Sequence, residues 1–523
     1  MEADLRFESS QSGRGAGPGV LSRVLVFVCV AAGVAAAAAL GATTTGYPLD
    51  DTWIHLNYAR SLVESQTFGY MAGTWENGST APLWSLLIAI PLALGVAPTL
   101  AAKLVGMLAL LFLVFFVHRV TAQIGCRVSA LLAALLVALD PWISVLAVSG
   151  MEPVAAGAAG FAATYFLLCG RAFPAGVALA AAGLLRPEMG VLLPILVLGS
   201  FAPSGTARRR PSVRWWLSLV GPPLAAGGAW MLYGVVVTGR ALPNAFWLKT
   251  HGDLDILAQF VALKALLFAQ FPIATAIVGL ISLLGLRRLY QRDERQLWLL
   301  VMPVFTILAA YVFRLPLGRD RGPMAAGSAE CIYFARYVLL VLPWLLTWIA
   351  LGATFLVDLL RGWFERRSST ALATKLSLGV ALALGALVVP SWQGHRLVLW
   401  TAYRANCAEI QDTQVALAHW IDSNLAADAV LGVSDAGAQG FYARGRKVID
   451  LMGLNSHQML AQPNPLQWLE AQGVTHVVVW PQWHRWLFAS PHHRLRRLAS
   501  VHNDNPTIVA EQDLVVFQFE HDH

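Results

Sequence analysis

Charged residues are scarce in this sequence. Only 13% of its 523 residues are Asp, Glu, Lys or Arg, whereas 57% are hydrophobic. A soluble globular protein carries roughly a quarter charged residues. The deficit is concentrated between about Val20 and Trp392, where apolar runs of helical length follow one another. The composition therefore argues against a soluble protein and predicts a polytopic α-helical membrane protein.

Cysteine is also sparse, and no internal repeat or low-complexity tract stands out. The five cysteines show no Cys-x-x-Cys spacing, and most lie in or beside apolar segments: Cys29, Cys126, Cys169, Cys331 and Cys407. We interpret them as small buried residues rather than as a disulfide or zinc framework. The net charge of +7 is explained by basic loops at membrane edges, so no nucleic acid is expected as a partner.

Apolar runs of the length needed to cross a membrane, about 20 residues, recur along the chain. The first, Val20 to Ala42, follows a mixed-charge polar tail (1–19) and is longer than the apolar part of a signal peptide, which indicates a transmembrane helix. Further spans are predicted at 99–117, 128–147, 153–170, 172–185, 188–201, 215–237, 257–286, 296–313, 337–359 and 371–392.

One apolar stretch, Pro82 to Gly95, is shorter than a full crossing and contains two prolines. If it is an interfacial or re-entrant helix, the basic loops at 118–127, 208–214, 287–295 and 361–367 all face one side, as expected of the cytoplasmic face. The sequence then predicts about eleven spans, a cytoplasmic N-terminus and an extracytoplasmic C-terminus. Residues 20–392 form the transmembrane domain, with 43–98 as its first outer loop.

The pattern changes in residues 393–523. Residues 408–425 have the spacing of an amphipathic helix, and four short β-rich runs follow between Gly, Asn and Pro: 429–433, 448–451, 475–480 and 514–519. These features predict a C-terminal extracytoplasmic α/β domain.

Acidic side chains gather on the predicted outer face. Asp50 and Asp51 precede an amphipathic helical pattern, and the dipole at a helix N-terminus favours the ionised carboxylate. Such a carboxylate can act as a general base or bind a divalent cation. The alternative is a helix N-cap with a solvated neighbour, and the motif alone does not separate the two. Glu152 and Glu188, the latter beside Arg186, are further candidates on this face.

A family resemblance is carried by the run Leu49-Asp-Asp-Thr-Trp-Ile-His-Leu-Asn-Tyr-Ala-Arg60, followed by Asn77-Gly-Ser-Thr-Ala-Pro-Leu-Trp84. It resembles the first outer loop of GT-C membrane glycosyltransferases, closest to the branch that contains the mycobacterial terminal β-arabinofuranosyltransferase. Further motifs match in order: Ser149-Gly-Met-Glu152, Leu185-Arg-Pro-Glu188, Leu242-Pro-Asn-Ala-Phe-Trp-Leu-Lys249, Ala335-Arg-Tyr337, Val433-Ser-Asp-Ala-Gly437 and Val448-Ile-Asp-Leu451.

The resemblance implies a sugar donor carried on a polyprenyl phosphate, in a bacterial inner membrane, and a glycan or lipid acceptor of the cell envelope. It assigns the general base to Asp50, with Asp51 second. Arg336 and Tyr337 are expected to hold the donor phosphate, helped by Lys249, because arginine pairs with two phosphate oxygens. The remaining substrate-binding candidates are His55, Glu152, Arg186 and Glu188. A divalent metal, Mg²⁺ or Mn²⁺, is expected on Asp50 and Glu152.

The branch suggests a pentofuranose such as arabinofuranose as the transferred sugar. Departures from the family pattern at Thr52-Trp53 and at 76–81 leave the sugar open. The rival hypothesis is a transporter or lipid-linked sugar flippase, which broken polar spans also suit. The absence of two similar halves favours an enzyme. A third hypothesis makes the outer domain a receptor or scaffold module, with Asp435 and Asp450 capping strands.

Overall fold

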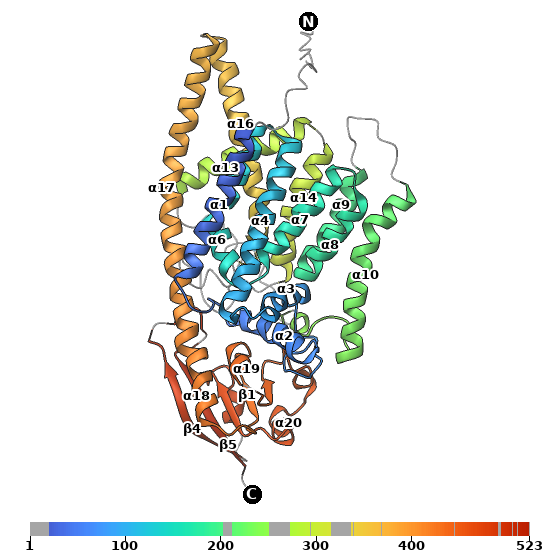
Figure 1. Ribbon diagram of the computed structural model, residues 1–523, viewed down its shortest axis with the longest axis vertical. Coiled ribbons are helices and arrows are strands. Elements are labelled where there is room, and N and C mark those ends of the chain that lie inside the picture. Colours follow the sequence, from blue (N-terminus) through green and yellow to red (C-terminus); the bar gives the residue numbers. More distant parts are fainter. Residues whose placement is uncertain are drawn as a thin grey trace.

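The computed structural model describes residues 20–201, 212–249, 272–314 and 336–521, apart from positions 293, 338, 368, 444, 490–492, 505 and 510. Figure 1 shows a bundle of helices that run along the long axis of the molecule, with a smaller α/β domain at its lower end. Two short helices, α2 (Asp51–Ser65) and α3 (Pro82–Ala93), lie between the two parts.

The bundle is built from apolar helices that pack along one another. They are α1 (Val20–Ala42), α4 (Pro98–Ile124), α5 (Arg127–Leu139), α6 (Pro141–Val148), α7 (Pro153–Leu168), α8 (Ala172–Leu185), α9 (Leu192–Phe201), α10 (Val213–Thr238), α11 (Asn244–Lys249), α13 (Pro272–Arg292), α14 (Glu294–Arg314), α16 (Leu342–Glu365) and α17 (Thr370–Ile410). Helix α7 packs against α4 and α8, and α16 packs against α5, α13 and α17.

The described residues do not confirm the predicted count of about eleven spans. Among the described residues, four helices are long and apolar enough to cross a membrane by themselves, or five if one bent pair counts as a span. Several of the other predicted spans are apolar helices of 10–17 residues. The predicted span 257–286 lies partly outside the described residues, as does the basic loop 208–214.

The bent pair is α5 and α6, which the sequence predicts as the single span 128–147. The two axes differ by 53°. The break has a local cause, because Pro141 has no backbone N–H to continue the α5 ladder. The carboxylate of Asp140 accepts the N–H of Ile143 at 2.9 Å and begins α6 as its N-cap.

The last predicted span, 371–392, lies within a helix that continues past the predicted domain boundary at residue 393. Helix α17 continues through a π-helical turn (Gln411–Val415) into α18 (Ala416–Asn424). The predicted amphipathic helix 408–425 is thus the lower part of one helical rod. This rod reaches from the top of the bundle into the α/β domain (Figure 1).

The α/β domain contains a five-stranded sheet with the order β2-β1-β3-β5-β4. Its strands are β1 (Leu431–Val433), β2 (Val448–Asp450), β3 (His476–Val479), β4 (His493–His502) and β5 (Asp513–His521). Strand β1 pairs in parallel with β2 and β3, and the β3–β5 and β5–β4 pairs are antiparallel. Four strands overlap the predicted runs, but the arginine-rich edge strand β4 has no such pattern and was not predicted. Helices α19 (Ala438–Tyr442) and α20 (Pro465–Ala471) complete the domain.

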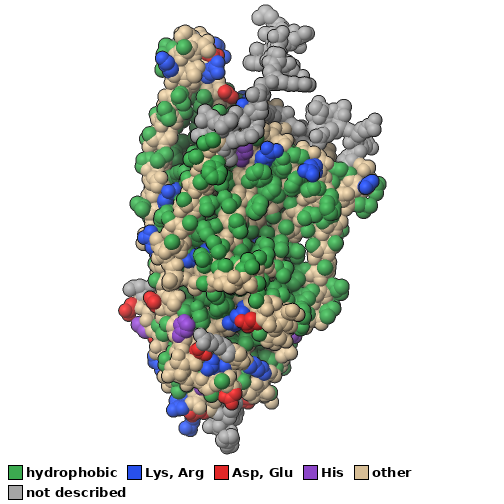
Figure 2. Space-filling view, in the orientation of Figure 1, with side chains coloured by type: hydrophobic (Ala, Val, Ile, Leu, Met, Phe, Trp, Pro, Cys, Tyr) green, Lys and Arg blue, Asp and Glu red, His purple; other side chains and the backbone are tan. Residues whose placement is uncertain are grey.

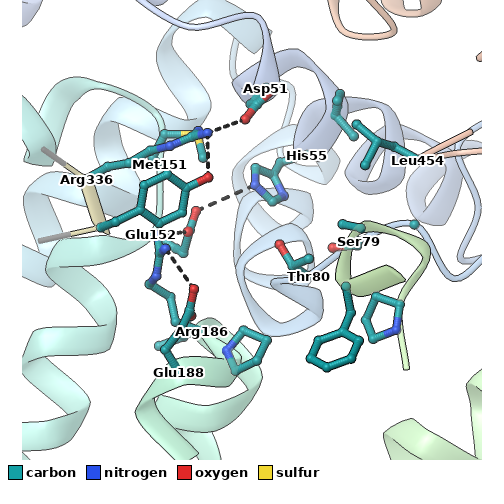
Figure 3. Close-up of a pocket in the computed structure, with 18 of the residues that line it drawn as sticks. Asp51, His55, Ser79, Thr80, Met151, Glu152, Arg186, Glu188, Arg336 and Leu454 are labelled. Atoms are coloured by element: carbon teal, nitrogen blue, oxygen red, sulfur yellow. Dashed lines mark hydrogen bonds and ion pairs between the residues drawn. The ribbon is translucent and has the colours of Figure 1, made fainter. Parts of the chain in front are cut away.

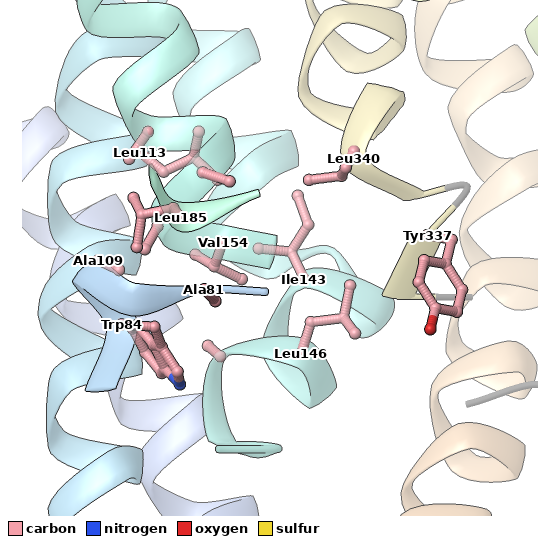
Figure 4. Close-up of a cluster of buried hydrophobic side chains, with 14 of the residues drawn as sticks. Ala81, Trp84, Ala109, Leu113, Ile143, Leu146, Val154, Leu185, Tyr337 and Leu340 are labelled. Atoms are coloured by element: carbon pink, nitrogen blue, oxygen red, sulfur yellow. The ribbon is translucent and has the colours of Figure 1, made fainter. Parts of the chain in front are cut away.

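Hydrophobic side chains form a broad band over the bundle, and charged side chains gather above it and on the α/β domain (Figure 2). Such a band is what a bilayer requires of the surface that it contacts. Inside the bundle, Trp84, Leu113, Val154 and Leu185 belong to one buried cluster (Figure 4). This cluster also contains Tyr337, which lines the cavity described next.

Candidate active site

A cavity of about 350 Å³ lies where α2, the loops of the bundle and the α/β domain meet. Charged and polar side chains line one side of it: Asp51, His55, Glu152, Arg186, Glu188 and Arg336. Ser79, Thr80 and Leu454 lie on the other side (Figure 3), and Leu242, Pro243, Ala245 and Phe246 add apolar surface. The cavity therefore offers a charged wall and a largely apolar wall to one ligand.

Asp51 and Arg336 form an ion pair at this cavity. The Arg336 Nη2 lies 2.6 Å from Asp51 Oδ2 (Figure 3). The Arg336 side chain is almost fully buried, whereas 36% of the Asp51 side chain is exposed. Asp51 is the first residue of α2, where the helix dipole stabilises a carboxylate. The pair joins the first outer loop to the chain just before α16.

A second buried charge network lies deeper along the same wall. Arg186 Nη1 lies 2.7 Å from Glu152 Oε1, and Arg186 Nη2 lies 3.3 Å from Glu188 Oε1. Arg186 Nη2 also donates to the Tyr311 hydroxyl at 3.4 Å. Buried charges need such partners because desolvation penalises an isolated ion. Arg186 is therefore held by three partners at the junction of α8 and the short helical turn 187–191.

His55 connects α2 to this network. Its Nε2 lies 3.6 Å from Glu152 Oε2, and its Nδ1 lies 3.4 Å from the Ser85 hydroxyl. Burial lowers the pKa of His55, although the nearby Glu152 and Asp51 carboxylates act in the opposite direction. A neutral His55 is suited to orient Glu152 or a substrate hydroxyl rather than to carry charge.

Tyr337 lies between the two arginines. The guanidinium carbon of Arg336 is 4.9 Å from the centroid of the Tyr337 ring, and that of Arg186 is 4.8 Å from it. The Tyr337 hydroxyl also accepts a hydrogen bond from Arg336 Nη2 at 3.0 Å. The ring thus places two cations close together on one wall, because each is attracted to the aromatic face.

Asp50, by contrast, does not line the cavity. Its two carboxylate oxygens accept the backbone N–H groups of Gly437 (2.7 Å) and Ala438 (2.8 Å) in the α/β domain. Asp50 therefore caps α19, and it makes no side-chain cap bond to its own helix α2. Gly437 has to be a glycine, since a Cβ there would lie 2.1 Å from the Asp50 carbonyl oxygen. The neighbouring Asn57 amide also donates to the Gly437 carbonyl at 3.1 Å.

The environment of Asp50 disfavours its charge. Burial raises the pKa of Asp50 well above its ordinary value, and the neighbouring Asp435 carboxyl adds to the rise. Burial also raises the pKa of Asp435, whose carboxylate accepts from Trp480 Nε1 (2.8 Å) and Gln414 Nε2 (3.0 Å). Both residues thus have structural partners inside the α/β domain or at its edge.

The α/β domain supplies Leu454 and Asn455 to the cavity wall. Asp450, at the end of β2, holds this loop: its Oδ2 accepts the backbone N–H of Asn455 at 2.8 Å and the Asn455 amide at 3.0 Å. The Asn455 Oδ1 accepts the Tyr58 hydroxyl from α2 at 3.2 Å. Sequence reasoning singled out the strand around Asp450 but missed the two cavity residues that follow it.

Polar contacts of Glu76 and Asn244 also hold the loop that contains Leu454 and Asn455. Glu76 Oε2 lies 2.8 Å from His457 Nδ1, and Glu76 Oε1 accepts the Asn244 amide at 3.0 Å. The Asn244 amide also donates to the Leu454 carbonyl at 3.1 Å. The first outer loop, the start of α11 and the α/β domain therefore meet at one buried carboxylate.

The structure brings seven of the nine predicted site residues to one cavity: Asp51, His55, Glu152, Arg186, Glu188, Arg336 and Tyr337. Asp50 lies outside that cavity, and the side chain of Lys249 lies outside the described residues. Tyr311, Phe246, Ser79 and Thr80 line the cavity although they were not predicted. Phe246 and the two hydroxyl residues fall within recognised motifs, whereas Tyr311 lies in an apolar helix without a polar pattern.

The predicted metal ligands have other partners. Glu152 pairs with Arg186, and Asp50 accepts two backbone N–H groups. In the described part of the chain, no three His, Cys, Asp or Glu side chains come together as a metal-binding group. These residues do not fit a divalent cation as they stand, so Mg²⁺ or Mn²⁺ remains a prediction and no chemical step below depends on it.

Comparisons with known proteins extend over nearly the whole chain. No curated protein matches it by sequence. Residues 405–516 match a family model described as "Domain of unknown function (DUF8728)". Solved structures are similar at low sequence identity. ArnT from Cupriavidus metallidurans in the apo state has a TM-score of 0.57 at 13% identity, and the match covers 95% of this chain and 97% of ArnT.

Two further structures give the same picture. The archaeal oligosaccharyltransferase AglB from Archaeoglobus fulgidus has a TM-score of 0.54 at 11% identity, covering 88% of this chain and 69% of AglB. The arabinofuranosyltransferase AftD from Mycobacteria has a TM-score of 0.51 at 15% identity, covering 96% of this chain but only 40% of AftD. All three are GT-C glycosyltransferases. The chain therefore has the GT-C fold.

Proposed function

We propose that this protein is an inverting glycosyltransferase that moves a sugar from a polyprenyl phosphate to a glycan or lipid acceptor of the cell envelope. The observation that carries the proposal is the cavity between the bundle and the α/β domain, in which Asp51 and Arg336 face one another. A carboxylate can take a proton from an acceptor hydroxyl, and an arginine can bind the phosphate that leaves.

The general base in this proposal is Asp51 rather than Asp50. Asp51 lines the cavity, whereas both carboxylate oxygens of Asp50 face backbone N–H groups of the α/β domain. A base has to be within hydrogen-bond reach of the proton that it removes. Asp50 instead positions α2, and thereby its neighbour Asp51, against the α/β domain.

The reaction is a single displacement at the anomeric carbon. The acceptor O–H transfers its proton to Asp51, and the acceptor oxygen forms a bond to the anomeric carbon. The bond between that carbon and the phosphate oxygen breaks, and the lipid phosphate leaves with the electron pair. Arg336 stabilises the charge that develops on this phosphate, which is the electrostatic part of catalysis. Phosphate is a good leaving group, so no protein acid is required.

The two walls of the cavity suit the two parts of a lipid-linked donor. The arginines on one wall attract the phosphate, and the apolar surface of Leu242, Pro243 and Phe246 is suited to the first isoprene units or to a sugar ring face. ArnT, which has the same fold, has been solved with undecaprenyl phosphate. We infer a cytoplasmic N-terminus and an α/β domain on the extracytoplasmic face of a bacterial inner membrane.

The sugar that we propose is a pentofuranose such as arabinofuranose. This rests on the motifs of the first outer loop and on the fold shared with the arabinofuranosyltransferase AftD. The acceptor lies on the side of Ser79, Thr80 and the Leu454–Asn455 loop, because the opposite wall carries the arginines.

The test uses the purified full-length protein in lipid nanodiscs with a panel of synthetic polyprenyl-phosphate pentofuranoses and hexoses. Release of lipid phosphate and a new glycosidic product are measured by mass spectrometry, with Asp51→Asn as the matched inactive control. We expect release from a pentofuranose donor by the wild type only. No release from any donor, while a GT-C enzyme turns over in parallel, would contradict the proposal. Movement of labelled donor across vesicles without transfer would favour the flippase.

A further inference from the structure

Asp51 has two roles at the cavity that conflict. It is the proposed base, yet its carboxylate is engaged by Arg336 at 2.6 Å. We propose, building on the proposed function, that the donor phosphate displaces Asp51 from Arg336, so that the base is released only when a donor is bound.

The surroundings of Arg336 favour exchange over simultaneous binding. Its Nη2 is directed at Asp51 Oδ2 and the Tyr337 hydroxyl, and its Nη1 lies 3.8 Å from the Met151 sulfur. One face of the guanidinium lies against the Tyr337 ring. A phosphate that approaches from the cavity therefore meets the same nitrogen that Asp51 occupies.

Charge makes joint occupancy unfavourable as well. The Arg336 side chain is 2% exposed, so water screens little of the repulsion between two anions placed on it. Arginine also forms two parallel hydrogen bonds with a phosphate, which a single shared nitrogen does not allow. The donor phosphate can therefore form both hydrogen bonds with Arg336 only if the Asp51 carboxylate moves away.

Asp51 is the partner that can move. Its side chain is 36% exposed and projects from the first turn of α2, whereas Arg336 is enclosed by Tyr337 and Met151. A carboxylate released from a guanidinium binds a proton more readily than one that is paired with it. Donor binding therefore strengthens the base at the moment when the anomeric carbon is in place.

Arg186 does not offer the phosphate the same opportunity. Its two carboxylate partners and the Tyr311 hydroxyl occupy both of its end nitrogens, and the Glu152 side chain is only 5% exposed. An exchange at Arg186 would leave a buried carboxylate without its cation, which is strongly unfavourable. Arg186 is thus a fixed charge behind Tyr337, and Arg336 is the exchangeable one.

The experiment measures binding of undecaprenyl phosphate, which carries no sugar and cannot react, to the full-length protein in nanodiscs. Tryptophan fluorescence or native mass spectrometry gives the dissociation constant. Asp51→Asn removes the competing charge, so we expect it to bind this lipid about five- to tenfold more tightly than the wild type. Arg336→Gln is expected to abolish the specific binding.

Glu188→Gln is the matched control. Glu188 also lines the cavity and is partly exposed, but its carboxylate pairs with Arg186 instead of Arg336. A general effect of cavity charge would tighten binding equally in both variants, and that result would overturn the exchange. Asp51→Ser provides a second neutral variant, and thermal unfolding checks that each protein is folded.

The outcomes separate this inference from the proposed function. If folded Asp51→Asn binds the lipid no more tightly than the wild type, while the wild type transfers sugar normally, the exchange is contradicted and the glycosyltransferase proposal stands. If Asp51→Asn binds the lipid more tightly but the wild type transfers sugar from no donor, the exchange is supported and the proposed glycosyltransferase reaction is contradicted. Wild-type protein and Asp51→Asn that both fail to bind the lipid phosphate would overturn the exchange.

Discussion

The backbone N–H of Gly437 donates a hydrogen bond of 2.7 Å to the carboxylate of Asp50, although 387 positions separate the two residues in the chain. This contact joins the first outer loop to the α/β domain directly beside the cavity. It also places two adjacent carboxylates differently, because Asp50 contacts the α/β domain whereas Asp51 lines the cavity. The first two predictions test that division.

Asp51→Asn should slow glycosyl transfer severely in a protein that is still folded at the assay temperature. Loss of a general base lowers the rate by about 100- to 10,000-fold. The change leaves the buried Arg336 without its carboxylate partner, so the unfolding temperature should fall, and transfer is compared at a temperature at which the variant is folded. Steady-state transfer rates and thermal unfolding in the same nanodiscs check this. Substantial residual transfer would remove Asp51 as the base.

Asp50→Ala should lower the stability of the protein but preserve glycosyl transfer. It leaves the Gly437 and Ala438 N–H groups without their acceptor, which costs about 1–3 kcal/mol for a buried group. We expect a lower unfolding temperature and faster hydrogen exchange in 437–442, but measurable transfer at temperatures at which the variant is folded. An inactive variant with unchanged stability would return the base to Asp50.

Glu152→Gln should destabilise the protein more than Glu188→Gln does. Both carboxylates pair with Arg186, but Glu152 is closer (2.7 Å against 3.3 Å) and more deeply buried (5% against 26% exposed). Removing one partner of a buried ion pair costs about 3–5 kcal/mol at the upper end. Thermal unfolding of the two variants side by side provides the comparison. Equal losses would mean that the network does not depend on burial.

His457→Ala should loosen the cavity wall without unfolding the domain. The change removes the imidazole that contacts Glu76, so the loop 451–457 loses one of its contacts with the rest of the chain, whereas the bond from Asn244 to Leu454 remains. Hydrogen exchange should rise in that loop, and the Michaelis constant for the acceptor should increase more than kcat falls. His502→Ala is the control, because it alters an exposed histidine whose described partners, Asp504 and Asp513, both lie in the α/β domain.

His484 predicts a pH dependence of stability. Burial lowers its pKa from about 6.5 to about 4, and neither ring nitrogen has a hydrogen-bond partner in the described part of the chain. Between pH 6.5 and 4 the unfolded chain binds a proton that the folded chain does not, so stability falls as the pH falls through this window. The full loss is of the order of 3 kcal/mol.

The measurement is thermal unfolding at several pH values for the wild type and for His484→Leu. The variant has no imidazole to protonate, so its stability should fall less steeply between pH 6.5 and 4. At pH above 6.5 the difference between the two proteins should be constant. Parallel curves over the whole range would show that His484 does not titrate in this way.

Much of the fold was predictable because apolar periodicity and length determine where helices form in a membrane protein. Helices α8 and α10 begin and end within two residues of their predictions. The break between α5 and α6 was not predicted, since a span with one Asp and one Pro is still apolar on average. Strand β4 was missed because its first half contains three exposed arginines and its pairing is irregular between Arg497 and Ala499, so the sequence shows no clear strand alternation.

The site was predictable as a set of residue types but not as a geometry. Motif order placed Arg186, Glu152 and Arg336 near the outer face, and they do converge on one cavity. The position of Gly437 determines which of the two adjacent aspartates faces that cavity. Gly437 belongs to another domain, so the sequence around Asp50 does not reveal this contact. The contribution of Leu454 and Asn455 was hidden for the same reason.

The helical rod from α17 to α18 has a mechanical consequence. A flexible linker would let the α/β domain swing freely, whereas a continuous helix transmits tilt from the membrane directly to that domain. The domain at the end of this helix contributes Leu454 and Asn455 to the cavity wall, so the position of that wall depends on the tilt of the bundle. The π-turn at Gln411–Val415 does not free the domain from this helix, because Thr413, Gln414 and Val415 are buried and the Gln414 amide donates to Asp435 in the α/β domain at 3.0 Å.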